Sequence, residues 1–391
     1  MHWHCWLVFS LKIQNILLLQ CQSNTLSMLS SGLTRPCLRH HASSLWKRRD
    51  FFAMGIGKTR FNASMVMGSY EKIKIGVVGA GAVGVGVCHN IINLGGCQEL
   101  VLIDQNVAKA EGEIFDFNHT QALTFTKNMK LKGGNNYEDL KDAAIVVITA
   151  GAQIKDGQSR LDLAEINSDI TVNIAKEIEK VAPNAILLLV TNPCDIATYF
   201  IVKNTSFPAN RVISAGCIVD TARLMTLVSQ RLEQTVDPKN ISGYILGEHG
   251  SNSFMPWSLV GVAGQPIDFY CDQNGYPRIS PDNLLEEVRQ AGYEIFKRKQ
   301  NTVHGISASV YRMIQAIIID EHSILPVGTL LQGEYGLHDV VVSLPTIMNQ
   351  TGAVKVLVHP FTSEELDTLH TVANALKSTI EGVVKATDLN G

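Results

Sequence analysis

Long apolar runs, paired cysteines and N-terminal acids are scarce in this chain of 391 residues. No stretch approaches the roughly eighteen consecutive apolar residues of a membrane-spanning helix, so we expect no function within a membrane. The eight cysteines include no C-x-x-C pair, which argues against a zinc site or a disulfide framework and predicts no bound metal. Residues 1–70 hold one acid, Asp50, against eight lysines and arginines.

This acid-poor segment over residues 1–70 differs in composition from the remainder of the chain. It is rich in Ser, Arg and Leu and has no helix or strand period, which is typical of an organellar transit peptide. We therefore predict a mitochondrial or other organellar location if the extension is real. If translation starts instead at Met67 the expected location is cytoplasmic, and a structural arm is a third reading of the segment.

The remaining 321 residues carry 25 basic and 35 acidic side chains. An acidic body disfavours nucleic acid and anionic membranes as general partners. The partners expected are small molecules.

Short apolar stretches alternate with helical patterns in the first half of this body. The stretches expected to be strands are 73–78, 99–104, 143–151, 185–193 and 211–216, with helices from about Ala82 and over 107–122. Fully apolar strands separated by helices are typical of a parallel sheet that is covered on both faces. The predicted fold class is α/β, with a Rossmann-type doubly wound parallel sheet.

The pattern changes after about Ala215. A long amphipathic helix, a mixture of strands and turns, two more helices, a β-rich stretch and a final helix follow. This order is typical of an α+β domain. The predicted organisation is an irregular N-terminal extension over 1–70, a Rossmann domain over 71–214 and an α+β substrate or catalytic domain over 215–391.

The string GAGAVG directly follows the first expected strand and places Gly79, Gly81 and Gly84 in a G-x-G-x-x-G arrangement. Such glycines permit a tight turn and let a pyrophosphate reach the N-terminus of the next helix. Asp104 ends the second strand, where a carboxylate would accept hydrogen bonds from ribose hydroxyls and repel a 2′-phosphate. The pattern predicts NAD as the cofactor. The plainer readings are a simple glycine turn and a carboxylate that caps the next helix.

Three side chains of the second domain could oxidise a hydroxy acid together with NAD. His249 lies in the glycine-flanked string GEHG, and Asp220 and Arg223 share one face of a helix. Histidine exchanges protons near neutral pH, a nearby carboxylate stabilises the imidazolium, and a guanidinium binds a substrate carboxylate. Each residue alone has a plainer reading, as a core histidine or as a surface ion pair.

The strings GAGAVG, GQSRLDL, TNPCD, DTARL, GEHG and LLQGEYGLHDVVVSLP together resemble the L-lactate/malate dehydrogenase family from Lys72 to about Val384. By this resemblance His249 is the proton donor and acceptor, and Asp220 is its partner. Arg223 would anchor the substrate carboxylate, and Arg160 would polarise the substrate carbonyl from a closing loop. The resemblance also implies that Asn192 binds substrate near the nicotinamide, Thr302 lines the substrate pocket and Ile306 packs on the nicotinamide.

Ile154 occupies the position in that loop at which malate dehydrogenases resemble one another in having arginine, and lactate dehydrogenases in having glutamine. An aliphatic side chain cannot neutralise a second substrate carboxylate, so oxaloacetate is disfavoured. L-lactate dehydrogenase is the predicted activity. The alternative is an L-2-hydroxyisocaproate-type dehydrogenase for longer 2-oxo acids, which Gly292 favours because the family commonly has alanine there.

The resemblance further implies a homo-oligomer, either a tetramer or a dimer. Two other classes compete with a dehydrogenase. An NAD-dependent glycosidase would need a Cys/His pair of metal ligands near the nicotinamide, and none can be assigned around Asn192 or Cys217. A non-catalytic protein on the same fold would have no need to keep His249, Asp220 and both arginines.

Overall fold

The computed structural model describes residues 73–153 and 159–390. The predictions made for residues 1–70 and for Ile154 therefore lie outside the described part of the chain. Within that part, no helix combines the length and apolar character that crossing a bilayer would require.

Six parallel strands form the first half of the main sheet, in the order β3-β2-β1-β4-β5-β6. They are β1 (Lys74–Val78), β2 (Glu99–Ile103), β3 (Lys130–Gly134), β4 (Ile145–Ile148), β5 (Ile186–Leu189) and β6 (Val212–Ser214). Every residue of β4 and β5 is buried, as continuous apolar strands in the middle of a covered sheet should be. The predicted doubly wound parallel sheet is confirmed.

β3 is the strand that the sequence pattern does not predict. It pairs only with β2 and lies at the edge of the sheet, and its first four residues alternate between exposed and partly buried. Lys130 and Lys132 point lysine side chains outward, where they pair with Glu99 and Asp139. Charged residues on an edge strand discourage pairing with another chain. Because of these lysines, the strand does not appear in the sequence as a continuous apolar stretch.

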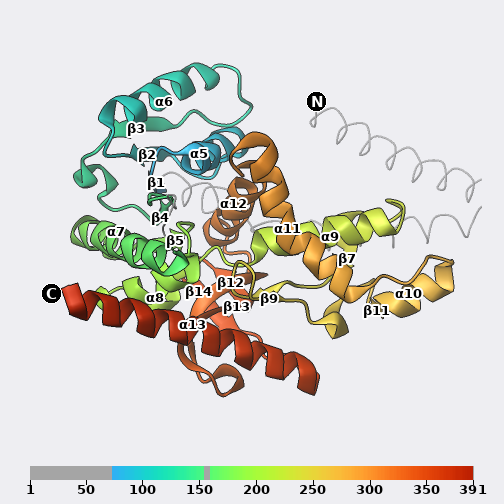
Figure 1. The fold of residues 1–391 in the computed structure, drawn as a ribbon. Helices are drawn as coiled ribbons and strands as arrows, with labels where there is room; N and C mark the ends of the chain where they lie inside the picture. The colour runs from blue at the N-terminus through green and yellow to red at the C-terminus, as the bar shows by residue number, and fades with distance from the viewer. Residues whose placement is uncertain (1–72, 154–158, 391) are drawn as a thin grey trace, which may run out of the picture. The chain divides into compact units, whose positions relative to one another are not determined.

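Helices cover both faces of the parallel strands (Figure 1). On one face, α5 (Ala82–Leu94) and α6 (Val107–Thr120) share a core cluster with α12 (His304–Ile318). On the other face lie α7 (Arg160–Val181), α8 (Cys194–Asn204) and the short 3-10 helix η1 (Tyr137–Leu140). A second 3-10 helix, η2 (Ala209–Arg211), leads into β6.

The main sheet does not end at β6. Gly328 of the next strand pairs antiparallel with Ser214, and the sheet runs on in the order β6-β12-β13-β8-β9, with β14 beside β13. These strands are β12 (Ser323–Gln332), β13 (His338–Asn349), β8 (Leu246–Gly247), β9 (Ser253–Phe254) and β14 (Gly352–Val356). One sheet therefore continues through the predicted division near residue 214.

The rest of the C-terminal half is built of helices around this antiparallel extension. They are α9 (Ile218–Arg231), α10 (Ile267–Asn274), α11 (Pro281–Lys299) and α13 (Ser363–Asn390), with 3-10 helices η3 (Pro238–Asn240), η4 (Trp257–Leu259) and η5 (Glu334–Gly336). A small separate sheet has the order β11-β10-β7, from β7 (Ile241–Ser242), β10 (Gly261–Val262) and β11 (Gln265–Pro266). The mixture of helices and strands agrees with the predicted α+β character.

Candidate active site

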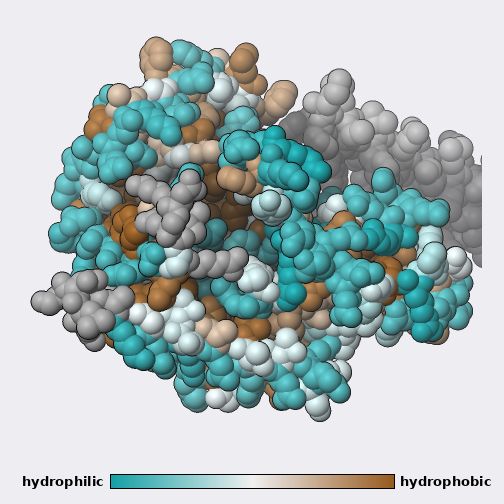
Figure 2. Space-filling model, viewed as in Figure 1, coloured by the Kyte–Doolittle hydropathy of each residue, from teal (hydrophilic) through white to brown (hydrophobic). Residues whose placement is uncertain are grey.

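Two cavities open where the parallel strands end. The first has a volume of about 680 Å³ and is lined from the ends of β1, β2 and β4, with Gly79, Gly81 and Asp104 in its wall. The second has a volume of about 820 Å³ and is lined by α9, α11, the start of α12 and the loop after β5. The face of the molecule drawn in Figure 2 is largely hydrophilic and is hollowed near its centre, where apolar residues come to the surface.

The glycine turn after β1 has the shape that a diphosphate needs. Gly79 has φ +112°, a backbone conformation that favours glycine. A Cβ on Gly84 would lie 1.9 Å from the Gly79 carbonyl oxygen, so only glycine lets α5 pack this closely on the turn. Gly81 precedes α5 without a side-chain cap, and a Cβ there would meet nothing within 4 Å. The N-terminus of the helix therefore has no side-chain cap and lies beside open space at Gly81.

Asp104 fixes the loop at the end of β2. Its Oδ2 accepts a hydrogen bond from the Ala80 backbone N–H at 2.7 Å, and its Oδ1 accepts one from Asn106 at 2.8 Å. Each carboxylate oxygen keeps a lone pair for a further donor such as a ribose hydroxyl. The reading of Asp104 as the cap of α6 is wrong, because Asn106 is the N-cap and accepts from Lys109.

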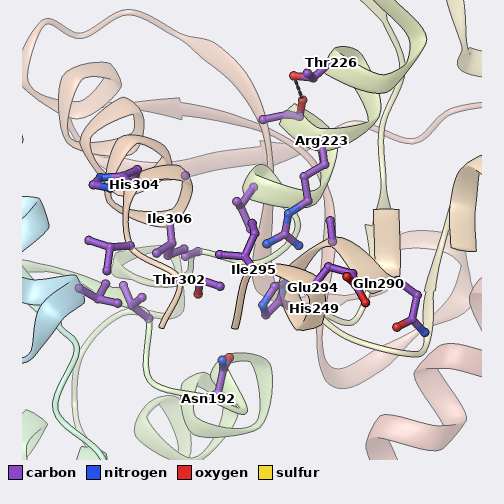
Figure 3. Close-up of a pocket in the computed structure, with 18 of the residues that line it drawn as sticks. Asn192, Arg223, Thr226, His249, Gln290, Glu294, Ile295, Thr302, His304 and Ile306 are labelled. Carbon is purple, nitrogen blue, oxygen red and sulfur yellow. Dashed lines mark hydrogen bonds between the residues drawn. The ribbon is translucent and has the colours of Figure 1, made fainter. Parts of the chain in front are cut away.

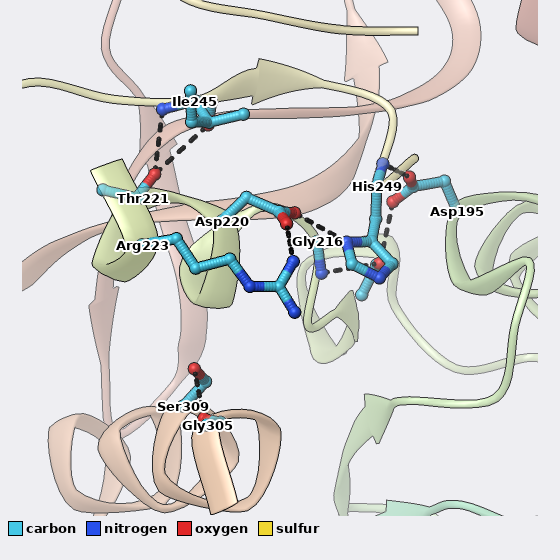
Figure 4. Close-up of polar contacts among 10 residues, drawn as sticks. Asp195, Gly216, Asp220, Thr221, Arg223, Ile245, His249, Gly305 and Ser309 are labelled. Atoms are coloured by element: carbon cyan, nitrogen blue, oxygen red, sulfur yellow. Dashed lines mark hydrogen bonds and ion pairs between the residues drawn. The ribbon is translucent and has the colours of Figure 1, made fainter. Parts of the chain in front are cut away.

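His249 and Arg223, which line the second cavity, form one hydrogen-bonded group with the buried Asp220 (Figure 4). Nδ1 of His249 lies 2.6 Å from Oδ2 of Asp220, and Nη1 of Arg223 donates to Oδ1 of the same carboxylate at 2.7 Å. Asp220 is 5% exposed, whereas the imidazole of His249 keeps 24% of its surface exposed. Because Nδ1 is engaged by the carboxylate, Nε2 is the ring nitrogen left to meet a substrate.

Charge within this group shifts two pKa values in opposite directions. Burial by itself would lower the pKa of His249, but the Asp220 carboxylate outweighs it and holds that pKa above its ordinary value. Burial would likewise raise the pKa of Asp220, and His249 with Arg223 reverses this and lowers it. The pair therefore favours an imidazolium beside a carboxylate, a state that can give up one proton.

The other residues predicted for the substrate pocket line the same cavity. Asn192 comes from the loop after β5, Thr302 precedes α12 and Ile306 lies in its first turn. Figure 3 shows Arg223, His249 and Thr302 converging from three elements, with Asn192 on the opposite side. Sequence positions 110 residues apart thus meet around one space.

Family models match nearly the whole described chain. Residues 73–214 match the lactate/malate dehydrogenase NAD binding domain, and residues 218–387 match the alpha/beta C-terminal domain of the same family. The chain belongs to the lactate/malate dehydrogenase family. It is therefore an NAD-dependent oxidoreductase, as the sequence predicts.

Relatives within this family agree in length and architecture. L-lactate dehydrogenase 2 of Clostridium acetobutylicum is 42% identical over 318 residues, which cover 81% of this chain and 98% of that protein. L-lactate dehydrogenase of Acetivibrio thermocellus is 42% identical over 310 residues, 79% of this chain and 96% of its own. The crystal structure of minor L-lactate dehydrogenase from Enterococcus mundtii, 36% identical, superposes with a TM-score of 0.75 over 79% of this chain and 98% of its own.

For a member of this dehydrogenase family, the residues of the first cavity fit the cofactor. The open space at Gly81 and the uncapped N-terminus of α5 would take the pyrophosphate of NAD, and the Asp104 carboxylate would take the hydroxyls of the adenosine ribose. Val83, two residues beyond Gly81, lines the second cavity. A dinucleotide lying across the glycine turn would therefore lead from one cavity into the other.

The loop that carries the family's specificity position is described only at its ends. Arg160 is the first residue of α7, directly after Ser159, whose side chain forms a capping box with Asp162. Gly292 faces Arg223: a Cβ there would lie 3.5 Å from Nη2 of the guanidinium, an ordinary contact. The hydrogen atom of glycine thus leaves the volume of about one methyl group beside the arginine.

Two buried polar residues in this site were not singled out by the sequence patterns. Asn167 of α7 is 1% exposed, exchanges two hydrogen bonds with the backbone of Ala152, at 2.7 and 3.1 Å, and donates to the Asn192 carbonyl at 2.7 Å. It therefore connects Ala152, in the wall of the first cavity, with Asn192, in the wall of the second. The other is Asp195.

Asp195 is 2% exposed and lies behind His249. Its Oδ2 accepts from the backbone N–H of His249 at 3.0 Å, and its Oδ1 accepts from the Ser214 hydroxyl at 2.7 Å. Burial raises the pKa of Asp195 to about 6, against the pull of these two hydrogen bonds. The signal that could have identified Asp195 is that it is the one charged residue in the string TNPCDIAT, residues 191–198.

Proposed function

We propose that this protein is an NAD-dependent L-lactate dehydrogenase that interconverts pyruvate and L-lactate. The observation that carries the proposal is the contact of one carboxylate with two charged groups. Asp220 binds Nδ1 of His249 and also the guanidinium of Arg223, and both of these residues line the same cavity. An acid–base histidine beside a guanidinium suits a substrate with a carboxylate next to a carbonyl. Both curated relatives described above are named L-lactate dehydrogenases.

In the direction of reduction, the imidazolium of His249 gives its Nε2 proton to the C2 oxygen of pyruvate. Asp220 stabilises the imidazolium before the transfer and holds the tautomer after it. Arg223 binds the substrate carboxylate with the guanidinium N–H groups that Asp220 does not occupy. NADH, when held by the residues of the first cavity, would supply the hydride for this reduction. In the reverse direction neutral His249 accepts the hydroxyl proton of lactate.

The remaining site residues have supporting roles in this proposal. Arg160, which begins α7, would polarise the substrate carbonyl when the loop before it closes and excludes water. Asn192 would donate to the substrate, and Thr302 and Ile306 would contact the substrate and the nicotinamide. The adenosine half of NAD would be held by Gly79, Gly81, Gly84 and Asp104.

Pyruvate is the preferred substrate in this proposal, ahead of branched or longer 2-oxo acids. The named relatives favour it, and the alternative L-2-hydroxyisocaproate-type activity rests on Ile154 and on the space at Gly292. Oxaloacetate would be used poorly, because Ile154 offers no cation to its second carboxylate.

The proposal extends to the organisation of the protein. We place the division between cofactor and catalytic parts near Ser214 and expect a tetramer or dimer in solution. About four-fifths of this chain matches nearly the full length of its relatives, and the family models match residues 73–214 and 218–387, which supports a catalytic part within residues 71–391. Their matches leave the first 70 residues without an assigned role, and we propose a cytoplasmic location, with an organellar one if those residues direct import.

The test is steady-state NADH oxidation by the full chain with pyruvate, 2-oxoisocaproate and oxaloacetate, compared by kcat/KM. We expect pyruvate to be preferred by at least about tenfold, since a single carboxylate and a small side chain suit Arg223 and an apolar neighbour. Preference for 2-oxoisocaproate would replace the proposal by its alternative. Efficient use of oxaloacetate would contradict the argument from Ile154.

A matched variant separates acid–base chemistry from binding. His249→Asn keeps the hydrogen bond to Asp220 but cannot exchange a proton, so kcat should fall by about a thousandfold or more while NADH still binds. An unchanged kcat would rule out His249 as the acid and base.

A further inference from the structure

The turn that carries His249 has little regular structure of its own. It joins β8 and β9, strands of two residues each; Gly247, the last residue of β8, has φ +98°, and Gly250 within the turn has φ +150°. Two hydrogen bonds of this segment, from the Ser253 N–H to the Gly250 carbonyl at 3.3 Å and from the Asn252 amide to the Glu248 carboxylate, do not involve His249. Something outside the turn must therefore hold it.

Two carboxylates from different helices form hydrogen bonds with His249 (Figure 4). Asp220 of α9 fixes the ring through Nδ1, and Asp195 of α8 fixes the backbone through the N–H of the same residue. The first contact orients the imidazole, while the second sets the place of its Cα. Both are needed to define where Nε2 lies.

We propose that Asp195, held in place by the hydroxyl of Ser214, is a positioning residue that sets the location of His249. The inference rests on the proposed role of His249 as acid and base. Asp195 touches neither substrate nor cofactor in this assignment, and it acts only through the histidine backbone.

Ser214 is suited to this task by its place at the end of β6. Its Oγ donates to Asp195 at 2.7 Å and accepts from the backbone N–H of Gly216 at 3.1 Å. Gly216 lines the substrate cavity, so a continuous chain of hydrogen bonds runs from the cavity wall through Ser214 and Asp195 to His249. A hydroxyl both donates and accepts, which an alanine at 214 could not do.

The surroundings of Ser214 and Asp195 are closely packed. Ser214 is fully buried and pairs with Gly328 of β12. A Cβ on Gly328 would lie 2.6 Å from Oδ1 of Asp195 and 2.7 Å from Cβ of Ser214. Glycine at 328 is thus required for the carboxylate to fit between α8 and the junction of β6 with β12.

The hydrogen bond from the His249 N–H to Asp195 depends on pH, because the Asp195 carboxyl is buried among other titratable groups. Glu248 and His249 face it from the β8–β9 turn, and the thiols of Cys194 and Cys217 lie near it at the starts of α8 and α9. Burial raises the pKa of Asp195 to about 6, and the Ser214 hydrogen bond opposes that rise. Below this pH the carboxyl takes up a proton and holds the His249 N–H less strongly.

The first test is Ser214→Ala in the full chain, assayed by pyruvate reduction between pH 5 and pH 8. We expect kcat to fall by about tenfold, because small displacements of a catalytic group are costly, and KM for NADH to be unchanged. The acid limb of the pH profile should move to higher pH, since the variant lacks a hydrogen bond that lowers the pKa of Asp195. Reduction needs a protonated histidine, so His249 itself produces no loss of rate at acid pH.

The matched control is Ser229→Ala in α9. Ser229 is also buried and donates a 2.6 Å hydrogen bond, but to the Val236 carbonyl, away from His249. Both variants should lower the melting temperature, and only Ser214→Ala should move kcat and the acid limb. If both variants change stability alone, the positioning role is wrong and Ser214 is merely structural.

Asp195→Asn completes the test. Its amide keeps an acceptor for the His249 N–H but, like the protonated carboxyl, carries no charge and cannot titrate. The acid limb should therefore disappear, and kcat at every pH should lie near the lowered value that the original chain shows at acid pH. Persistence of the limb would overturn the inference. An active His249→Asn variant would instead overturn the proposed function, so the two failures are distinguishable.

Discussion

At the scale of single residues, one carboxylate serves both charged groups of the substrate cavity. Asp220 is nearly buried and divides its two oxygens between His249 and Arg223. Sharing the anion keeps the histidine readily protonated and limits the directions in which the guanidinium can turn. The two residues proposed as the acid–base group and the substrate anchor are therefore held by the same side chain.

Replacement of this carboxylate should change the pH dependence of the reaction. In Asp220→Asn the negative charge that raises the pKa of His249 is absent, so the pKa falls. Pyruvate reduction needs the protonated ring, and its alkaline limb should therefore move to lower pH, with kcat/KM reduced by about a thousandfold. A pH series of kcat/KM measures both effects. An alkaline limb at the original pH would show that Asp220 does not control the proton.

At the scale of secondary-structure elements, a capping box fixes the backbone at the start of α7, where Arg160 is the first helical residue. Ser159 is the N-cap, its Oγ accepts from the Asp162 N–H at 3.1 Å, and Oδ2 of Asp162 accepts from the Ser159 N–H at 2.8 Å. This capping box satisfies donors that the first helical turn would otherwise leave unpaired.

Loss of that cap should lower activity more than stability. Ser159→Ala removes a contact worth about 1 kcal/mol, which frays the first turn and leaves Arg160 less well placed. We expect KM for pyruvate to rise by several-fold and the Kd for NADH, followed by fluorescence, to be unchanged. Asp162→Asn, which keeps an acceptor for the Ser159 N–H, should have a smaller effect. Equal loss of NADH binding would argue against a local role of the cap.

The elements also show which features the sequence pattern could predict. β4 and β5 are continuous apolar runs because both faces of their sheet are covered, and such runs stand out in a sequence. β3 was not predicted, because an edge strand keeps its lysines in solvent and so lacks a continuous apolar stretch. The contacts of Asp195 with Ser214 and His249 could not be predicted, since they join residues 19 and 54 positions apart through the fold alone.

At the scale of the whole molecule, one sheet links the cofactor half to the catalytic half. β6 is the last parallel strand and β12 the first antiparallel one, and Gly328 pairs with Ser214 at their junction. α12 adds a second link, because it packs in the same core cluster as α5 and α6. Unfolding of one half would expose the core of the other, so we expect a single cooperative thermal transition in calorimetry over residues 73–390. Two separate transitions from this region would contradict the shared sheet.

The junction itself can be probed with a pair of glycine variants. Gly328→Ala places a methyl group 2.6 Å from Oδ1 of Asp195 and should cost about 1–3 kcal/mol, as overpacking of a core does. Gly112→Ala in α6 is the matched control, because a Cβ there meets nothing within 4 Å and alanine favours the helix by about 1 kcal/mol. Urea unfolding followed by circular dichroism should give a lower midpoint for the first variant and an equal or higher one for the second. A midpoint unchanged by Gly328→Ala would contradict the close packing of β6, β12 and α8 at this junction.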